Sequence, residues 1–427
     1  MKYCRAYIFT ILFSLSVPFF AQGQTVAGQN AVPPVPGSEL TLKVAVIGPG
    51  DELYFWWGHL GLVVENNRDG TARFYDYGVF SFENTNFFVN FALGRLLYTC
   101  EASRAEANIG HYVRTNRDVI LYTLDLSPAD KLEVFDFAQW NVQPENKDYY
   151  YHHFRDNCAT RIRDIIDMAV KGQFKEKYGD APGRYTLRQH VRRHTWFSPF
   201  FDWMLNFLMG RGIDTPISVW DEMFLPSEIG RRIEEFSYRD ASGRERKLVT
   251  DIEVVNRAEG RPGVLDSPPR FWTGELLLGL AIALALFAAL KIPGGRPFLG
   301  MGQALIGLSF GLSGVVLLFM TFFTNHDYTY HNINLLFVNP LLLAALPLGL
   351  RFAFGKKPEQ RDRAEKFLRL LFTYVSAACL VTILIRVLPG YHQQNQCVQA
   401  LVLPFSLALS FFPRWTLLAA RRIMRRG

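Results

Sequence analysis

The sequence predicts a two-part protein of the α+β class, in which an exported domain of mixed strands and helices precedes an all-α membrane domain. Apolar residues make up 49% of the 427-residue chain, but long apolar runs occur only from residue 271 onward. Residues 40–265 instead show short alternating runs, typical of strands and amphipathic helices. The loops between the long runs differ in their Lys and Arg content, as the loops of membrane proteins do.

The N-terminal segment is typical of a signal peptide. A charged start precedes an apolar run from Tyr7 to Phe20, which is shorter than an ordinary membrane span, and small residues at 21–23 offer a cleavage site. We expect residues 1–23 to be a signal peptide and the Pro/Gly-rich residues 24–39 to be a leader with little structure. An uncleaved anchor is the alternative, and in both cases the next domain is exported.

Residues 40–265 are expected to form one mixed domain. Two strands should pair in a hairpin around Arg68-Asp69-Gly70, and Ser127 should cap a helix that starts with Pro128. In chain order, the pattern predicts a strand at 40–50, the hairpin at 60–80, a strand at 118–126, helices at 127–142 and 156–172, and a strand at 246–257.

Two segments of this domain leave alternatives open. Residues 196–209, WFSPFFDWMLNFLM, are too short to cross a bilayer and predict either a core helix or a helix at the membrane interface. Residues 184–194, RYTLRQHVRRH, predict a solvated basic helix face, with contact to anionic headgroups or to a lipoprotein as the alternative.

The last part of the chain, residues 266–427, is expected to be a membrane domain with about five helices. Lys and Arg concentrate in the loops after the first and third spans and in the tail, whereas TNHDYTYHN and PGYHQQNQ have none. The positive-inside bias therefore places these two His-containing loops on the side of the exported domain. The net charge of +7 follows the basic loops, so we expect a membrane and no nucleic acid as partner. The five spans are 271–291, 299–323, 333–350, 367–388 and 398–412.

A cysteine at the predicted start of a helix is the candidate nucleophile. Cys158 lies in DNCATRIRDII, where Asp156 or Asn157 is expected to be the helix N-cap. The positive end of a helix favours a thiolate, and its free N–H groups can stabilise an oxyanion. The alternative is a disulfide with Cys100, the other cysteine of the exported domain.

A histidine at the mouth of an apolar strand is the candidate base. His59 opens this strand in GHLGLVV, and Asp76 in the following strand could orient its imidazole. No cofactor is expected. Four outer-loop residues leave a metal site open as an alternative to contacts with lipid headgroups: His326, Asp327, His331 and His392.

The order of His59 and Cys158 along the chain resembles that of a known group of enzymes. An early GHLGL box followed by an NC helix resembles circularly permuted NlpC-like thiol enzymes and the lecithin–retinol acyltransferase-like group. Longer stretches resemble the Lnb family of lipoprotein N-acyltransferases over nearly the whole chain after the signal peptide. They include WWGHLGLVV, YDYGVFSFENTNFFVNFALGRLLY, YYYHHFRDNCATRIRDII and FFTNHDYTYHNINLLFVNPLLL. This implies a circularly permuted papain-like (NlpC-like) exported domain and five transmembrane helices.

The resemblance also implies an activity. An acyl chain would pass from a phospholipid, through a thioester on Cys158, to the N-terminal amine of a diacylglyceryl-cysteine lipoprotein, with His59 as the base. Asp76 departs from the Asn expected in the family's Asn-Tyr-Gly. The enzyme would lie in the bacterial inner membrane with its catalytic domain in the periplasm. A membrane-anchored peptidoglycan hydrolase and a non-enzymatic sensor are the alternatives. The candidate substrate-binding residues are Asn157, Tyr77, Arg386, His326 and His331.

Overall fold

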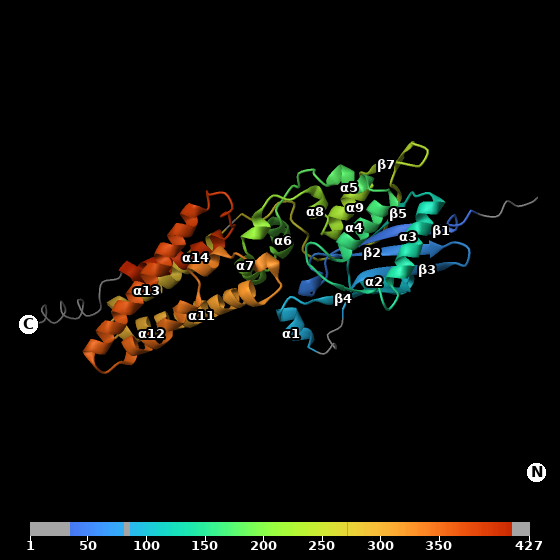
Figure 1. The fold of residues 1–427 in the computed structure, drawn as a ribbon. Helices are drawn as coiled ribbons and strands as arrows, with labels where there is room; N and C mark the ends of the chain where they lie inside the picture. Colours follow the sequence, from blue (N-terminus) through green and yellow to red (C-terminus); the bar gives the residue numbers. More distant parts are fainter. Residues whose placement is uncertain (1–34, 81–85, 271, 412–427) are drawn as a thin grey trace, which may run out of the picture. The chain divides into compact units, whose positions relative to one another are not determined.

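A seven-stranded antiparallel sheet organises the first domain, with strand order β6-β4-β3-β2-β1-β5-β9 (Figure 1). The computed structural model describes residues 35–80, 86–270 and 272–411, so the predicted signal peptide and the leader up to residue 34 lie outside the described residues. The strands are β1 Leu40–Ile47, β2 His59–Asn66, β3 Thr71–Val79, β4 Leu97–Arg104, β5 Val119–Leu124, β6 Asp148–Tyr150 and β9 Val249–Asn256. A separate pair consists of β7 Ser237–Arg239 and β8 Glu245–Lys247.

Local sequence signals explain the elements that were predicted. The β2–β3 hairpin turns at Gly70, whose φ of +70° is unfavourable for residues with a Cβ. The Ser127 hydroxyl accepts a hydrogen bond from Asp130 N at the start of the following helix. The strand predicted at 246–257 is divided between β8 and β9.

Helices cover both faces of the sheet, which explains why the central strands are apolar on both sides. One face packs against α3 Pro128–Asn141, α4 Cys158–Ala169 and α9 Pro226–Glu234, and alternate β2 residues such as Leu60 and Leu62 lie in this core. Val63 points to the other face, toward α2 Ala105–Arg114. The remaining elements are η1 Leu53–Phe55, α1 Phe87–Ala92, α5 Gln173–Tyr178, α6 Leu187–Thr195, α7 Pro199–Leu208, η2 Arg211–Asp214 and α8 Val219–Glu222.

The C-terminal region is helical, as predicted. Among the residues that the structure describes, four segments are long and apolar enough to cross a membrane, at 273–291, 296–323, 333–354 and 358–385, and a fifth apolar helix is shorter. Helices α11 to α14 lie side by side in the orange and red part of the ribbon (Figure 1). The elements are α10 Thr273–Lys291, α11 Arg296–Phe323, η3 Asp327–Thr329, η4 Ile333–Leu336, η5 Pro340–Ala344, α12 Ala345–Phe354, α13 Pro358–Ile385 and α14 Gln396–Phe411.

The third span is a broken segment and not the continuous helix that its apolarity predicts. Asn339 accepts a hydrogen bond from Leu341 N through its side chain, and Pro340 has no N–H to continue a helix. Glycines of α11 allow this segment to pack closely. A Cβ on Gly314 would lie 2.4 Å from the Asn339 backbone, and one on Gly307 would lie 2.7 Å from the Leu342 carbonyl oxygen. Small residues have this role at many membrane helix interfaces.

The prediction of a solvated basic face at 184–194 is wrong. Arg188 and His190 of α6 are fully buried, and Arg193 and His194 are nearly so. The alternation of basic residues does not distinguish a solvated helix from one whose charges are paired inside the protein. Their partners are far away in the sequence, so the local pattern could not reveal them.

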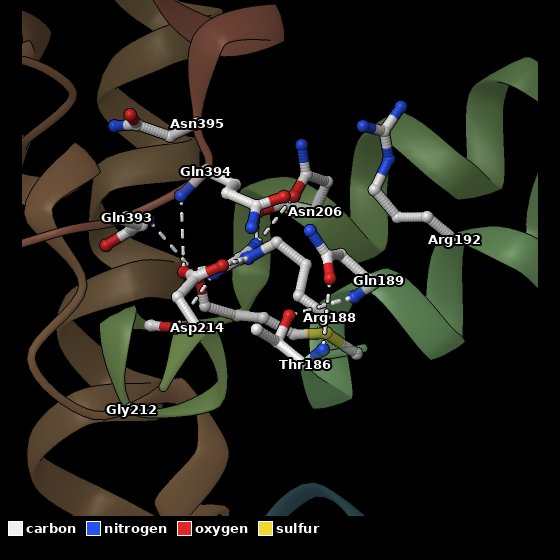
Figure 2. Close-up of polar contacts among 12 residues, drawn as sticks. Thr186, Arg188, Gln189, Arg192, Asn206, Gly212, Asp214, Gln393, Gln394 and Asn395 are labelled. Carbon is white, nitrogen blue, oxygen red and sulfur yellow. Dashed lines mark hydrogen bonds and ion pairs between the residues drawn. The ribbon is translucent and has the colours of Figure 1, made fainter. Parts of the chain in front are cut away.

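Arg188 is the centre of a buried polar cluster that joins the two domains (Figure 2). Its Nε lies 2.9 Å from Asp214 Oδ1, and its Nη1 donates to Asn206 Oδ1 at 2.6 Å. From the loop before α14, Gln394 N donates to Asp214 Oδ2 at 3.2 Å. The Gln393 side chain donates to the Met209 carbonyl oxygen at 3.4 Å. A loop of the membrane region therefore completes the environment of a buried ion pair in the first domain.

Helix α7 belongs to the same junction, where its end packs in an apolar core, as the first alternative for residues 196–209 expected. Phe207 packs in the apolar cluster of the membrane helices, while Phe200 is 67% exposed. The Asn332 side chain donates to the Phe207 carbonyl oxygen at 2.9 Å. Asn332 and Gln393 lie in or beside the two loops without Lys or Arg, and both contact the first domain. The predicted shared side of these loops is therefore confirmed.

Candidate active site

Cys158 is the first residue of α4, as the sequence predicted. Asn157 is the N-cap: its Oδ1 accepts from Thr160 N at 2.9 Å, and Thr160 Oγ1 accepts from Asn157 N at 2.8 Å. The Asn157 amide also donates to the carbonyl oxygens of His153 and Phe224, at 2.8 and 3.0 Å. These four bonds fix the start of the helix and hence the position of the thiol. Asn157 therefore has a clear positioning role.

His59 faces Asp76, its predicted partner. The histidine Nε2 lies 2.9 Å from Asp76 Oδ1, so this nitrogen donates to the carboxylate and Nδ1 is left to exchange a proton. Asp76 Oδ1 also accepts from Gly78 N at 2.8 Å. A Cβ on Gly78 would lie 2.6 Å from His59 Cε1, so a larger residue would displace the imidazole. The Asp-Tyr-Gly sequence thus both holds the ring and leaves space for it.

The buried histidine is biased toward its charged form. Burial acts to lower the pKa of His59, but the charge of Asp76, with smaller contributions from Tyr112 and Cys158, raises it well above its usual value. Burial acts to raise the pKa of Asp76, yet the charge and hydrogen bond of His59 and the Gly78 N–H lower it. His59 and Asp76 therefore form an ion pair near neutral pH.

Cys158 lies within electrostatic reach of His59. No direct hydrogen bond between the two side chains occurs in the described structure, and each residue is 8% exposed. Catalytic hydrogen bonds are often long before substrate binds, so this geometry is compatible with proton transfer in a substrate complex. The arrangement can activate a thiol beside the positive end of a helix.

The disulfide alternative is wrong, because Cys100 and Cys158 are both free. Cys100 lies within β4, inside the core, and burial raises the pKa of its thiol to about 12. It therefore stays protonated at physiological pH. Of the two cysteines, only Cys158 lies at a helix start beside a histidine.

Replacing Asp76 by Asn should remove the charge that keeps His59 protonated. The ion pair exists between the lowered pKa of Asp76 and the raised pKa of His59, so its stabilisation is complete just below pH ~6.5 and is lost as pH rises through the His59 pKa. We expect the melting temperature of Asp76→Asn to lie furthest below wild type at pH ~5–6.5, with a smaller difference in alkali. Thermal unfolding of the full chain in detergent at several pH values measures this.

The matched control is Asp69→Asn in the β2–β3 turn. Asp69 bonds to Thr71, and its pKa is lowered mainly by the Thr71 hydroxyl. Its contribution to stability is lost only as pH falls through that lowered pKa, so the control should show a constant difference from wild type above pH ~5. A difference for Asp76→Asn that is equally constant through neutral pH would contradict the ion pair.

The loop before Cys158 contacts the first His-containing loop of the membrane region. His152 Nε2 lies 2.9 Å from Asp327 Oδ1, and Arg155 Nη1 lies 3.1 Å from Asp327 Oδ2. The Tyr328 hydroxyl lies 2.7 Å from His326 Nδ1 and 3.4 Å from His153 Nδ1. The membrane region therefore supports the segment that carries Cys158.

Of the other candidate residues, Tyr77 shares a buried apolar cluster with Cys158, whereas Arg386 and His326 make their hydrogen bonds elsewhere. Tyr77 is fully buried in the core and leaves no side-chain surface for a substrate. Arg386 donates to Gln399 Oε1 at 2.6 Å, and His326 Nε2 donates to the Phe91 carbonyl oxygen at 2.9 Å. His331 is exposed and has a φ of +54°. Within the described ranges, no cluster of three or more His, Cys, Asp or Glu residues could hold a metal ion.

Sequence reasoning missed two residues that shape the site. The ring of Tyr112 on α2 lies 6.1 Å from that of His59, and Tyr112 makes a small contribution to lowering the pKa of the Asp76 carboxyl. Gly78 lies in the Asp-Tyr-Gly sequence, and the sequence pattern predicted no role for it. A glycine two residues after Asp76 could have been recognised in the sequence as a position near the carboxylate. Nothing in the sequence near Tyr112 distinguished it from other tyrosines.

The fold and the site define a class: a membrane protein with a periplasmic α+β domain and a helical transmembrane region. Two family models match the chain, the Lnb N-terminal periplasmic domain at residues 34–193 and the Lnb transmembrane domain at residues 272–417. The chain belongs to the Lnb family, whose domains are those of lipoprotein N-acyltransferase-like membrane proteins. Comparison with curated proteins and with solved structures gives no match.

Proposed function

We propose that this protein is a lipoprotein N-acyltransferase that uses Cys158 as its nucleophile and a phospholipid as its acyl donor. The observation that carries the proposal is the position of Cys158, at the start of a capped helix and within electrostatic reach of the His59–Asp76 pair. A thiol enzyme on membrane-spanning helices has direct access to lipid esters. Membership of the Lnb family supports the same chemistry.

The first half-reaction acylates the cysteine. His59 holds the thiol proton, and the Cys158 thiolate attacks the ester carbonyl carbon of the phospholipid. The carbon–oxygen ester bond breaks, and His59 gives its proton to the departing oxygen, which leaves as a lysophospholipid. The thioester forms as the ester is lost. The N–H groups of Cys158 and Ala159 belong to the unsatisfied first turn of α4 and can bind the oxyanion.

The second half-reaction transfers the acyl chain to an amine. The free α-amino group of a diacylglyceryl-cysteine attacks the thioester carbonyl, and His59 accepts its proton. The carbon–sulfur bond breaks, the amide forms, and Cys158 regains the proton. Asp76 keeps the imidazole oriented through both halves. The place of action is the inner membrane, where both substrates have their acyl chains.

The test uses the full chain in lipid nanodiscs with a phospholipid and a synthetic diacylated lipopeptide. Mass spectrometry should show one acyl chain added to the lipopeptide amine and one lysophospholipid formed. The rival hydrolase of wall peptides would instead cleave muropeptides and leave the lipopeptide unchanged. Cleavage of muropeptides without amine acylation would contradict the proposal.

A further inference from the structure

An aromatic helix, α1, contacts the first His-containing loop of the membrane region and has no role in the mechanism above. Phe88 and Phe91 of this helix are 73% and 47% exposed. Large exposed aromatic side chains are uncommon on a surface that faces water and are typical of membrane interfaces. The helix therefore has the surface of an element that meets lipid.

Backbone contacts hold α1 against the end of a membrane-spanning helix. Helix α11 ends at Phe323, and two residues later Asn325 N donates to the Leu93 carbonyl oxygen at 2.8 Å. A Cβ on Gly94 would lie 2.9 Å from the Asn325 carbonyl carbon, so the two segments are in close contact. Helix α1 thus lies at the end of a candidate membrane span, and we infer that its exposed aromatic face is covered by lipid.

A cavity of about 560 Å³ opens next to this helix. This volume falls within the range of about 300–1,000 Å³ that is common for small-molecule sites. Its walls combine an apolar surface with charge of both signs, since Glu101 and Asp148 line it beside two basic residues. This combination suits an acyl chain attached to a zwitterionic headgroup. The apolar and basic lining residues used below are Phe87, Phe91, Leu97, Tyr98, Arg95 and Lys147.

Tyr98 connects the cavity to the nucleophile. Its ring stacks on that of Tyr151 with centroids 4.1 Å apart, and Tyr151 begins the loop that leads to Cys158. Burial first, and then the nearby Cys158 thiol, raises the pKa of both tyrosines. The cavity wall therefore reaches, through one stacked pair of rings, the loop that ends at Cys158.

We propose that this cavity receives an acyl chain of the phospholipid donor, which enters from the bilayer over α1. Arg95 and Lys147 face its phosphate, and the ester is presented to Cys158. This inference rests on the proposed function and adds the site that selects the donor chain. A variant that fills the cavity should therefore slow loading from donors with long acyl chains and leave loading from donors with short chains unchanged.

The experiment measures loading of the full chain in nanodiscs by phosphatidylethanolamines with acyl chains of either sixteen or eight carbons. The variant is Leu97→Trp, which adds bulk inside the cavity. The matched control is Tyr150→Trp, because Tyr150 pairs with Leu97 in the sheet and does not line the cavity. The rate of acyl addition to Cys158 is followed by intact-protein mass spectrometry.

We expect Leu97→Trp to load the long chain at least tenfold more slowly than wild type and the short chain at nearly the wild-type rate. Tyr150→Trp should resemble wild type with both donors. Equal loading of both donors by Leu97→Trp and wild type, or an equal loss with both, would overturn the inference and leave the proposed function intact. Absence of loading in the wild type with every donor would overturn both.

Discussion

Cys158→Ala should abolish acyl transfer to the lipoprotein amine, with a loss of at least about 10³-fold in rate. The substitution removes the sulfur that forms the thioester, and no described side chain beside His59 can replace it. The assay is mass spectrometry of a lipoprotein N-terminus from cells that rely on this enzyme. The fold should persist, because the N-cap bonds of α4 involve Asn157 and Thr160 and not the thiol.

Cys100→Ala is the matched control for this prediction. Cys100 is a buried free cysteine of the same domain, one strand away from Asp76 in the sheet. Its loss removes a sulfur from the core and should cost stability without removing transfer. Unchanged N-acylation in Cys158→Ala, or an equal loss in both variants, would contradict a specific role for Cys158.

Among the single variants considered, Arg188→Met should lower the free energy of unfolding the most. The side chains of Arg188 and Asp214 are 0% and 1% exposed, so the variant leaves a buried carboxylate without its cation. Breaking a buried pair in this way costs about 3–5 kcal/mol. Arg188 also donates to the Asn206 side chain and to the carbonyl oxygens of Met209 and Gly210. We expect a large fall in the thermal unfolding midpoint of the full chain in detergent.

An exposed ion pair gives the control. Arg104 and Glu106 are 83% and 86% exposed, so Arg104→Met should cost less than about 1 kcal/mol. The double variant Arg188→Met with Asp214→Leu should recover part of the loss, since it removes the unpaired charge. If Arg188→Met were no more destabilised than Arg104→Met, the buried cluster would not hold the two domains together.

Local signals made part of this structure predictable. The β2–β3 hairpin depends on a turn at Gly70, α3 on the Ser127 cap, and α4 on the Asn157 cap, and each is encoded within a few residues. The same local signals place Cys158 at a helix start and His59 at a strand start. The strand that follows His59 then suggested Asp76 as the partner of the imidazole, and the structure brings the two within hydrogen-bond distance.

Long-range partners made the rest unpredictable. The basic residues of α6 follow the pattern of a solvated helix, but Arg188 is buried with Asp214 and Asn206, and the other basic residues named above are buried too. The segment 87–114 has no clear period, so α1 and β4 were not anticipated. The third span is apolar enough for a helix, but Asn339 and Pro340 break it against the glycines of α11.

The most direct test of the account is detection of the acyl group on Cys158 itself. The full chain is incubated with phospholipid and no acceptor, then digested, and the peptide that contains Cys158 is examined by mass spectrometry. The account predicts one acyl chain on this peptide, removed by hydroxylamine and transferred when a diacylated lipopeptide is added. An unmodified Cys158 in a preparation that N-acylates the lipopeptide would contradict the thioester mechanism.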